Sequence, residues 1–151
     1  MSFVQLAVIP WYDAAMHETF EHTADLGWRA IAPDLNTLFA EMAMALSESV
    51  VEHPEAIQPL EEQTFEIAGT DREYLLFDWL RELLYRFDAE HIVFAKFAVT
   101  VRSDGLSATA WGEPLDTARH GVGHEVKAIT YHELKVEQTP AGWLAEVIVD
   151  I

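Results

Sequence analysis

Two segments of the chain carry apolar residues at helical spacing, and segments with strand-like patterns precede, separate and follow them. The first helix is expected over residues 35–50 with Asp34 as its N-cap, and the second extends to about Phe87. Thr70 and Glu73 fit a capping box at the start of the second helix. The order of elements predicts an α+β fold in which two helices pack on one antiparallel-rich sheet.

Strand patterns dominate the part of the chain that follows the second helix. The expected strands there cover residues 92–102, 106–110, 126–137 and 143–151. Asp104-Gly105 is a strong hairpin signal between the first two of them. The polar segment 113–125 is long for a loop in a compact domain, which is typical of loops that are functional or mobile.

Composition excludes several classes of function. The net charge is −17, from 26 acidic and 9 basic side chains, and the basic residues are dispersed. Strong nucleic-acid binding draws on clustered Lys and Arg, so no strong direct nucleic-acid binding is expected. The sequence has no cysteine, which excludes disulfides and thiolate zinc sites. With no membrane span and no signal-peptide pattern, we expect a soluble cytoplasmic protein.

Three acidic groups are candidate metal ligands. Asp150 and the carboxylate of Ile151 lie at the end of an apolar final strand, and Asp25 lies in a turn after an earlier strand. Carboxylates held close together repel one another unless a cation or a proton joins them. Their oxygens suit Ca²⁺ or Mg²⁺ better than zinc. The alternative is that Asp25 caps its turn and Asp150 is a solvated strand end.

Other polar residues allow more than one interpretation. His22 is either a ligand or acid/base near the carboxylates or a structural group. Lys127 either pairs with a carboxylate or keeps its ammonium group in water, and His132 follows it on the same expected strand. His120 and His124 have the spacing of a helical zinc site, but two intervening glycines favour a flexible loop.

Several short segments together resemble the archease family. In chain order they are Phe20-Glu-His-Thr-Ala-Asp25, residues 78–88, Gly112-Glu113, His120 with residues 125–132, and Val147-Ile-Val-Asp-Ile151. The resemblance implies a small α+β fold with an SHS2-type module. It also implies a non-enzymatic helper of RtcB-type RNA ligases, which promotes guanylylation of the ligase and multiple turnover in tRNA splicing or RNA repair.

The same resemblance implies a metal site and a partner. The family's metal ligands match Asp25, Asp150 and Ile151, and Ca²⁺ is the expected ion, with Mg²⁺ or Mn²⁺ serving in the cell. His22, Lys127 and His132 would support this site or contact the ligase. The ligase binds RNA itself, which agrees with the acidity of this chain.

The resemblance covers residues 18–151, expected to form one archease-like domain, and it says nothing about residues 1–17. That N-terminal extension could add a strand over residues 3–9, mediate self-association, or result from a misassigned start codon. Two other functions remain open. One is a small metal-dependent hydrolase that uses Asp25 and Asp150 with His22 as base, and the other is a general acidic chaperone.

Overall fold

The computed structural model describes residues 15–22 and 25–151, and the short strand expected over residues 3–9 lies outside them. The described elements are β1 (Met16–His22), β2 (Asp25–Ala32), α2 (Leu35–Val50), a 3₁₀ turn η1 (Pro54–Ala56), β3 (Glu61–Ala68), α3 (Arg72–Glu90), β4 (Ile92–Arg102), β5 (Gly105–Pro114), α4 (Thr117–His120), β6 (Ala128–Ile129), β7 (Lys135–Thr139) and β8 (Gly142–Asp150). No helix within these ranges combines the length and apolarity that a membrane span requires.

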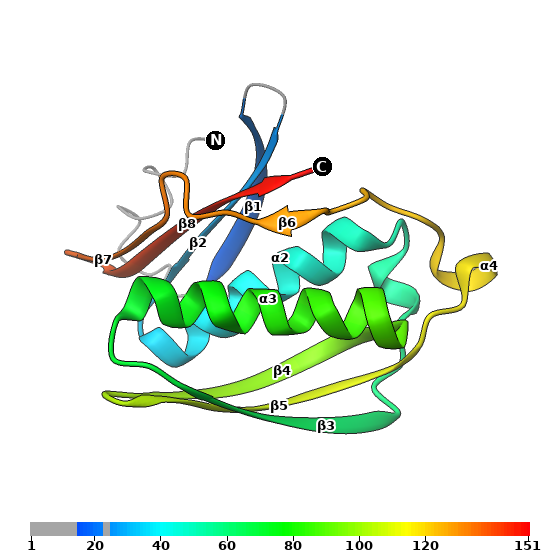
Figure 1. The fold of residues 1–151 in the computed structure, drawn as a ribbon, viewed down its shortest axis with the longest axis horizontal. Coiled ribbons are helices and arrows are strands. Elements are labelled where there is room, and N and C mark those ends of the chain that lie inside the picture. Colours follow the sequence, from blue (N-terminus) through cyan, green and yellow to red (C-terminus); the bar gives the residue numbers. More distant parts are fainter. Residues whose placement is uncertain (1–14, 23–24) are drawn as a thin grey trace.

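The strands form two antiparallel sheets, and the long helices α2 and α3 lie between them (Figure 1). The larger sheet has the order β1-β2-β8, and both β6 and β7 pair with the free side of β8. The smaller sheet has the order β3-β5-β4. The predicted α+β class, with two long helices on antiparallel strands, is confirmed. The strands divide into two sheets rather than one because the helices bury residues against strands on both sides.

The helix starts follow from capping side chains. The Asp34 carboxylate accepts the amide of the residue three positions later at 2.7 Å, as predicted. In α3 the equivalent bond is made by Asp71 at 3.0 Å, so the cap is one residue later than the predicted Thr70. The helix also continues to Glu90, one turn beyond the predicted end near Phe87. The residues of this added turn are exposed, and the helix ends at His91, which has a left-handed conformation and donates its backbone amide to the Phe87 carbonyl at 3.1 Å.

Two fully buried tryptophans connect the helices to the sheets. Trp28 of β2 donates its indole N–H to the Ser49 hydroxyl of α2 at 2.9 Å. Trp79 of α3 donates to the Phe39 carbonyl of α2 at 3.1 Å, and its ring lies edge-on to Phe65 of β3 with 5.2 Å between centroids. Because both buried N–H groups have partners, the large rings contribute apolar burial without leaving a polar group unsatisfied.

A histidine attaches β1 to α2. His17 lies with Nδ1 3.5 Å from the Glu41 carboxylate and Nε2 2.7 Å from Glu48. Hydrogen bonding to Glu41 and Glu48 raises the pKa of His17 to about 9. The boundary expected between the N-terminal extension and the domain, at residues 17 and 18, falls within β1, because residues on both sides of it pair with β2.

The long strand predicted over residues 126–137 is wrong. Ile129 of β6 pairs with Val149 of β8, and Lys135 of β7 pairs with Glu146 of the same strand. Five residues of the chain therefore face only two residues of β8, so they must leave the sheet as a turn. This turn separates β6 from β7 and carries two of the polar residues considered below.

Candidate metal centre

The predicted acidic ligands lie at the end of the larger sheet where β8 finishes. His22 pairs with Asp25 at the end of the β1–β2 hairpin, and Leu26 pairs with Val149. The next facing positions on β2 and β8 are Asp25 and Asp150. Figure 1 shows this end of β8 between the β1–β2 hairpin and β6, close to the C-terminus.

The register also determines which face of the sheet these side chains occupy. Leu26 and Val149 are buried in the core that the helices share with the sheet. Successive residues of a strand alternate between faces, and directly paired residues share one. His22, Asp25 and Asp150 therefore form a row on the face that points away from the helices. Asp150 is exposed and Asp25 is half-buried, so a solute can reach this row.

The chemistry of the row suits a hard divalent cation. Asp25 and Asp150 contribute carboxylate oxygens, and the carboxylate of Ile151, whose residue is 39% exposed, follows Asp150 directly. Oxygen donors are the ligands that Ca²⁺ prefers, and Mg²⁺ is bound through one or two carboxylates with water. The donor set therefore fits the ion that the resemblance implies.

His22 contacts the turn between β6 and β7. Its Nε2 lies 3.0 Å from a carboxylate oxygen of Glu133, and its ring meets that of His132 edge-on with 5.4 Å between centroids. The Nε2 of His132 lies 3.9 Å from the same oxygen of Glu133. The structure therefore brings together two of the predicted supporting residues, His22 and His132, and it adds Glu133, which no sequence pattern indicates.

Lys127 lies beside the strand end through its backbone. Its amide donates to the Asp150 carbonyl at 2.8 Å, which continues the pairing of β6 with β8. The side chain is exposed and makes no ion pair within the described ranges. Of the two interpretations of this lysine, the exposed side chain agrees with an ammonium group in water.

The segment 113–125 contains a second histidine–glutamate contact, in a closed environment. The buried Glu113 carboxylate accepts hydrogen bonds from both terminal nitrogens of Arg119, at 2.8 and 2.7 Å. It also accepts one from the backbone amide of Gln58 at 2.7 Å. His120 is fully buried and lies with Nε2 2.9 Å from Glu113, while its Nδ1 accepts the Asp116 amide at 2.9 Å. These bonds, those of Arg119 first, lower the pKa of Glu113 to about 2 against the opposing effect of burial.

This cluster overturns the zinc interpretation of His120 and His124. Both ring nitrogens of His120 already have partners, and the amide bond to Nδ1 assigns the proton to Nε2. His124 is exposed beyond an extended segment whose amides bond to α2 carbonyls. The structural role of Glu113 was not predicted, and the only hint was an acid and a histidine in one long polar loop.

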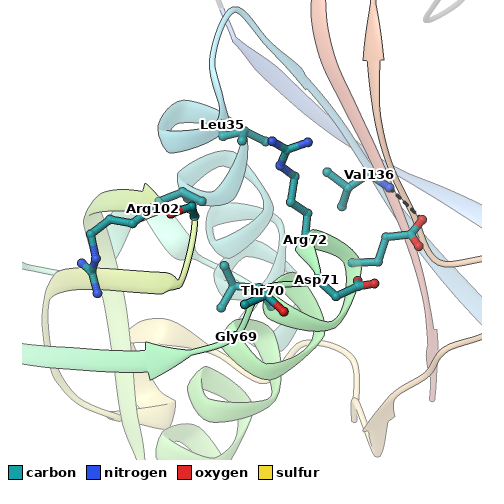
Figure 2. A pocket seen from close by; sticks show the side chains of 11 residues that line it. Leu35, Gly69, Thr70, Asp71, Arg72, Arg102 and Val136 are labelled. Carbon is teal, nitrogen blue, oxygen red and sulfur yellow. Dashed lines mark hydrogen bonds between the residues drawn. The ribbon is translucent and has the colours of Figure 1, made fainter.

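A cavity of about 630 Å³ opens at the N-terminal end of α3, away from the predicted ligands (Figure 2). Its two arginines already have partners. Arg72 lies 4.9 Å from the Trp143 ring centroid, and Arg102 pairs with Glu66 at 3.4 Å. Figure 2 shows their guanidinium groups extending in different directions. None of the predicted catalytic carboxylates lines this cavity, so it is not the pocket that the hydrolase interpretation requires.

The described residues thus define a small α+β protein with two helices enclosed by two antiparallel sheets and acidic groups at one strand end. The sequence model of the Archease protein family (MTH1598/TM1083) matches residues 17–151. The chain belongs to the archease family, and the predicted resemblance is confirmed.

Individual relatives match over nearly their whole length. The archease of Pyrococcus furiosus is 41% identical over 139 residues, which cover 89% of this chain and 97% of the relative. The archease of Methanopyrus kandleri is 37% identical over 147 residues, covering 95% and 100% of the two chains. The family match over residues 17–151 includes both strand ends that carry the predicted ligands.

Solved structures agree on the fold. The solution structure of protein 1598 from Methanobacterium thermoautotrophicum has a TM-score of 0.78 and 37% identity, and the match covers 89% of this chain and 98% of that one. A crystal structure from Thermotoga maritima, of an archease described as a possible chaperone, has a TM-score of 0.58, with 89% and 96% of the chains covered. At 21% identity it supports the fold alone.

Proposed function

We propose that this protein is a non-catalytic activator of an RtcB-type RNA ligase in tRNA splicing or RNA repair, acting in the cytoplasm. It promotes guanylylation of the ligase and allows multiple turnover. The observation that carries the proposal is the pairing of Leu26 with Val149, from which we infer that Asp25 and Asp150 face one another, in a chain that belongs to the archease family.

In this proposal the working feature is a divalent cation held by Asp25, Asp150 and the carboxylate of Ile151. A set of oxygen donors favours Ca²⁺, with Mg²⁺ or Mn²⁺ serving where they are more available. The cation would offset the repulsion between neighbouring carboxylates and present an open coordination position. His22, Lys127 and His132 would support the site or contact the ligase.

Charge supports a basic protein partner. The chain carries a net charge of −17, and a ligase that binds RNA must present basic groups to it. Complementary charge speeds encounter and orients the two proteins. The acidic strand end would enter the nucleotide site of the ligase and help to arrange the cation that guanylylation needs. RNA would then be bound by the ligase and not by this chain.

A turnover assay tests the proposal. The matching RtcB-type ligase is supplied in catalytic amount with excess RNA, and ligated product is measured with and without this protein. We expect the wild-type protein to convert single turnover to multiple turnover and Asp150→Asn to abolish that gain. Glu62→Gln, which removes one exposed charge from the other sheet, serves as the control and should activate normally. Equal activation by Asp150→Asn and wild type would reject the proposed site.

A further inference from the structure

We propose that His22, His132 and Glu133 form a second cation site, which takes a transition-metal ion such as Zn²⁺. One nitrogen from each histidine and one oxygen of Glu133 all lie within 4.8 Å of one another. The site needs neither Asp25 nor Asp150, so it can be present whether or not the metal site proposed above exists. It joins the β1–β2 hairpin to the turn after β6, two segments far apart in the sequence.

The distances are compatible with one shared ion. Zinc bonds to histidine nitrogen and carboxylate oxygen are about 2.0–2.1 Å, so two ligands at a tetrahedral angle are about 3.3 Å apart. The Glu133 oxygen lies 3.0 Å from Nε2 of His22 and 3.9 Å from Nε2 of His132, values on either side of that spacing. Small side-chain rotations would therefore bring all three atoms into coordination.

Ligand chemistry separates this site from the neighbouring carboxylates. Imidazole nitrogen suits Zn²⁺, Cu²⁺ and Ni²⁺, whereas carboxylate-only sites suit Ca²⁺ and Mg²⁺. Two histidines and one glutamate are the protein ligands of a well-known type of zinc site that leaves the fourth position open. The side chains of Glu133 and His132 are 59% and 62% exposed, so that position faces solvent and could accept water or a group from a partner.

The turn that carries two of the ligands is anchored by contacts to α3 and β8. Tyr131 stacks on Phe77 of α3 with 3.9 Å between ring centroids, and Leu134 donates its amide to the Tyr131 carbonyl at 3.2 Å. The Thr130 hydroxyl donates to the Ile148 carbonyl of β8 at 2.7 Å. These contacts fix the backbone on both sides of the ligands and reduce the entropy lost on metal binding.

Backbone conformation points the same way. Glu133 has φ of +54°, one of two non-glycine residues in the described ranges with positive φ. A residue with a side chain is sterically strained in the left-handed region, and such strained residues are concentrated at functional sites. In this conformation the Glu133 carboxylate lies 3.0 Å from Nε2 of His22.

Metal titration of the full chain tests the inference. The protein is stripped with chelator, Co²⁺ is added as a spectroscopic probe, and Zn²⁺ is then titrated in competition. We expect one Zn²⁺ to displace Co²⁺, and we expect His132→Ala and Glu133→Gln each to weaken Zn²⁺ binding at least about tenfold, since even outer partners of metal ligands contribute that much. His124→Ala, which removes an exposed loop histidine, should leave the affinity unchanged.

Two results would overturn the inference. One is equal Zn²⁺ affinity of wild type and His132→Ala, which would mean that His22 and Glu133 form only an ion pair. The other is loss of Zn²⁺ binding in Asp150→Asn as large as that in His132→Ala, which would assign the ion to the carboxylate pair. In the wild-type protein, paramagnetic shifts of the His22 and His132 ring protons on Co²⁺ addition give the same answer without any variant.

Discussion

The contact of Glu113 with His120 and that of Glu133 with His22 both place a glutamate about 3 Å from a histidine nitrogen, but the two contacts differ in burial and in the number of bonding partners. Glu113 near the end of β5 lies 2.9 Å from His120 of α4, and both are buried with every ring nitrogen and carboxylate oxygen bonded. At the end of the larger sheet, Glu133 lies 3.0 Å from His22, with its side chain 59% exposed and a second histidine nearby.

The comparison shows that residue types alone do not assign a role. In the buried cluster of Glu113 and His120 every polar atom already has a hydrogen-bond partner, so none is available to a ligand. This cluster attaches the segment after β5 to the rest of the protein. An exposed and unsaturated cluster contributes little to folding but keeps donors available for a cation. The predictions below test this division between a structural cluster and a binding cluster.

The largest expected effect is on stability at the buried cluster. Glu113→Gln removes the charge that Arg119 pairs with and leaves polar groups of His120 and Gln58 poorly matched. The Glu113 side chain is buried but that of Arg119 is 41% exposed, so the loss of unfolding free energy should be about 1–3 kcal/mol, less than for a fully buried pair. Urea denaturation measures this value. Glu125→Gln, an exposed carboxylate in the same segment, serves as the control, and equal losses in the two variants would contradict the assignment.

The contribution of Glu113 should also depend on pH. Its folded-state pKa is about 2, below the value of 4.5 for a free glutamate. A lowered pKa means that the stabilisation is present above pH 4.5 and is lost as pH falls from there through about 2. The stability difference between wild type and Glu113→Gln should therefore shrink across this window. A difference that stays constant down to pH 2 would show that the charge of Glu113 is not responsible.

An intermediate effect is expected at His17, whose side chain is 19% exposed beside Glu41 and Glu48. Its pKa is raised from 6.5 to about 9, so its stabilisation is complete below pH 6.5 and is lost as pH rises through about 9. His17→Gln should cost about 1 kcal/mol at pH 6 and almost nothing near pH 10. Denaturation at the two pH values measures both, and a cost that grows with pH would refute the assignment.

The smallest effect on stability is expected at the exposed cluster. Glu133→Gln should change the unfolding free energy by no more than about 0.5 kcal/mol, because exposed ion pairs contribute little. The same substitution at Glu113 is the matched comparison within one protein. A loss at Glu133 as large as that at Glu113 would show that the sheet end is a structural cluster as well.

The sequence predicted the parts of the fold that depend on local signals. Asp34 and the apolar stripe of α2 specify a helix within one stretch of chain, and Asp104-Gly105 specifies the β4–β5 hairpin. The position of Asp150 directly after a buried strand was also predictable, because the apolar residues of β8 continue to Val149. The α3 cap was misplaced by one residue because Thr70 and Asp71 are both good capping residues.

The rest depends on contacts between distant segments. The turn between β6 and β7 has no glycine or proline, so alternation continued through it and predicted one long strand. The length of this turn is determined by the pairing of β6 and β7 with β8, and local sequence does not reveal that pairing. The contact of His22 with Glu133 likewise joins residues more than 100 positions apart, and no pattern along the chain marks it.

The most direct measurement of the central claim is calorimetric titration of Ca²⁺ into the chelator-treated protein. The account predicts one bound ion in wild type and in the control Glu62→Gln, and loss of that binding in Asp25→Asn and Asp150→Asn. Addition of one glycine after Ile151 should also weaken binding, because it moves the chain carboxylate away from Asp150. Unchanged Ca²⁺ affinity in Asp25→Asn and Asp150→Asn would contradict the account.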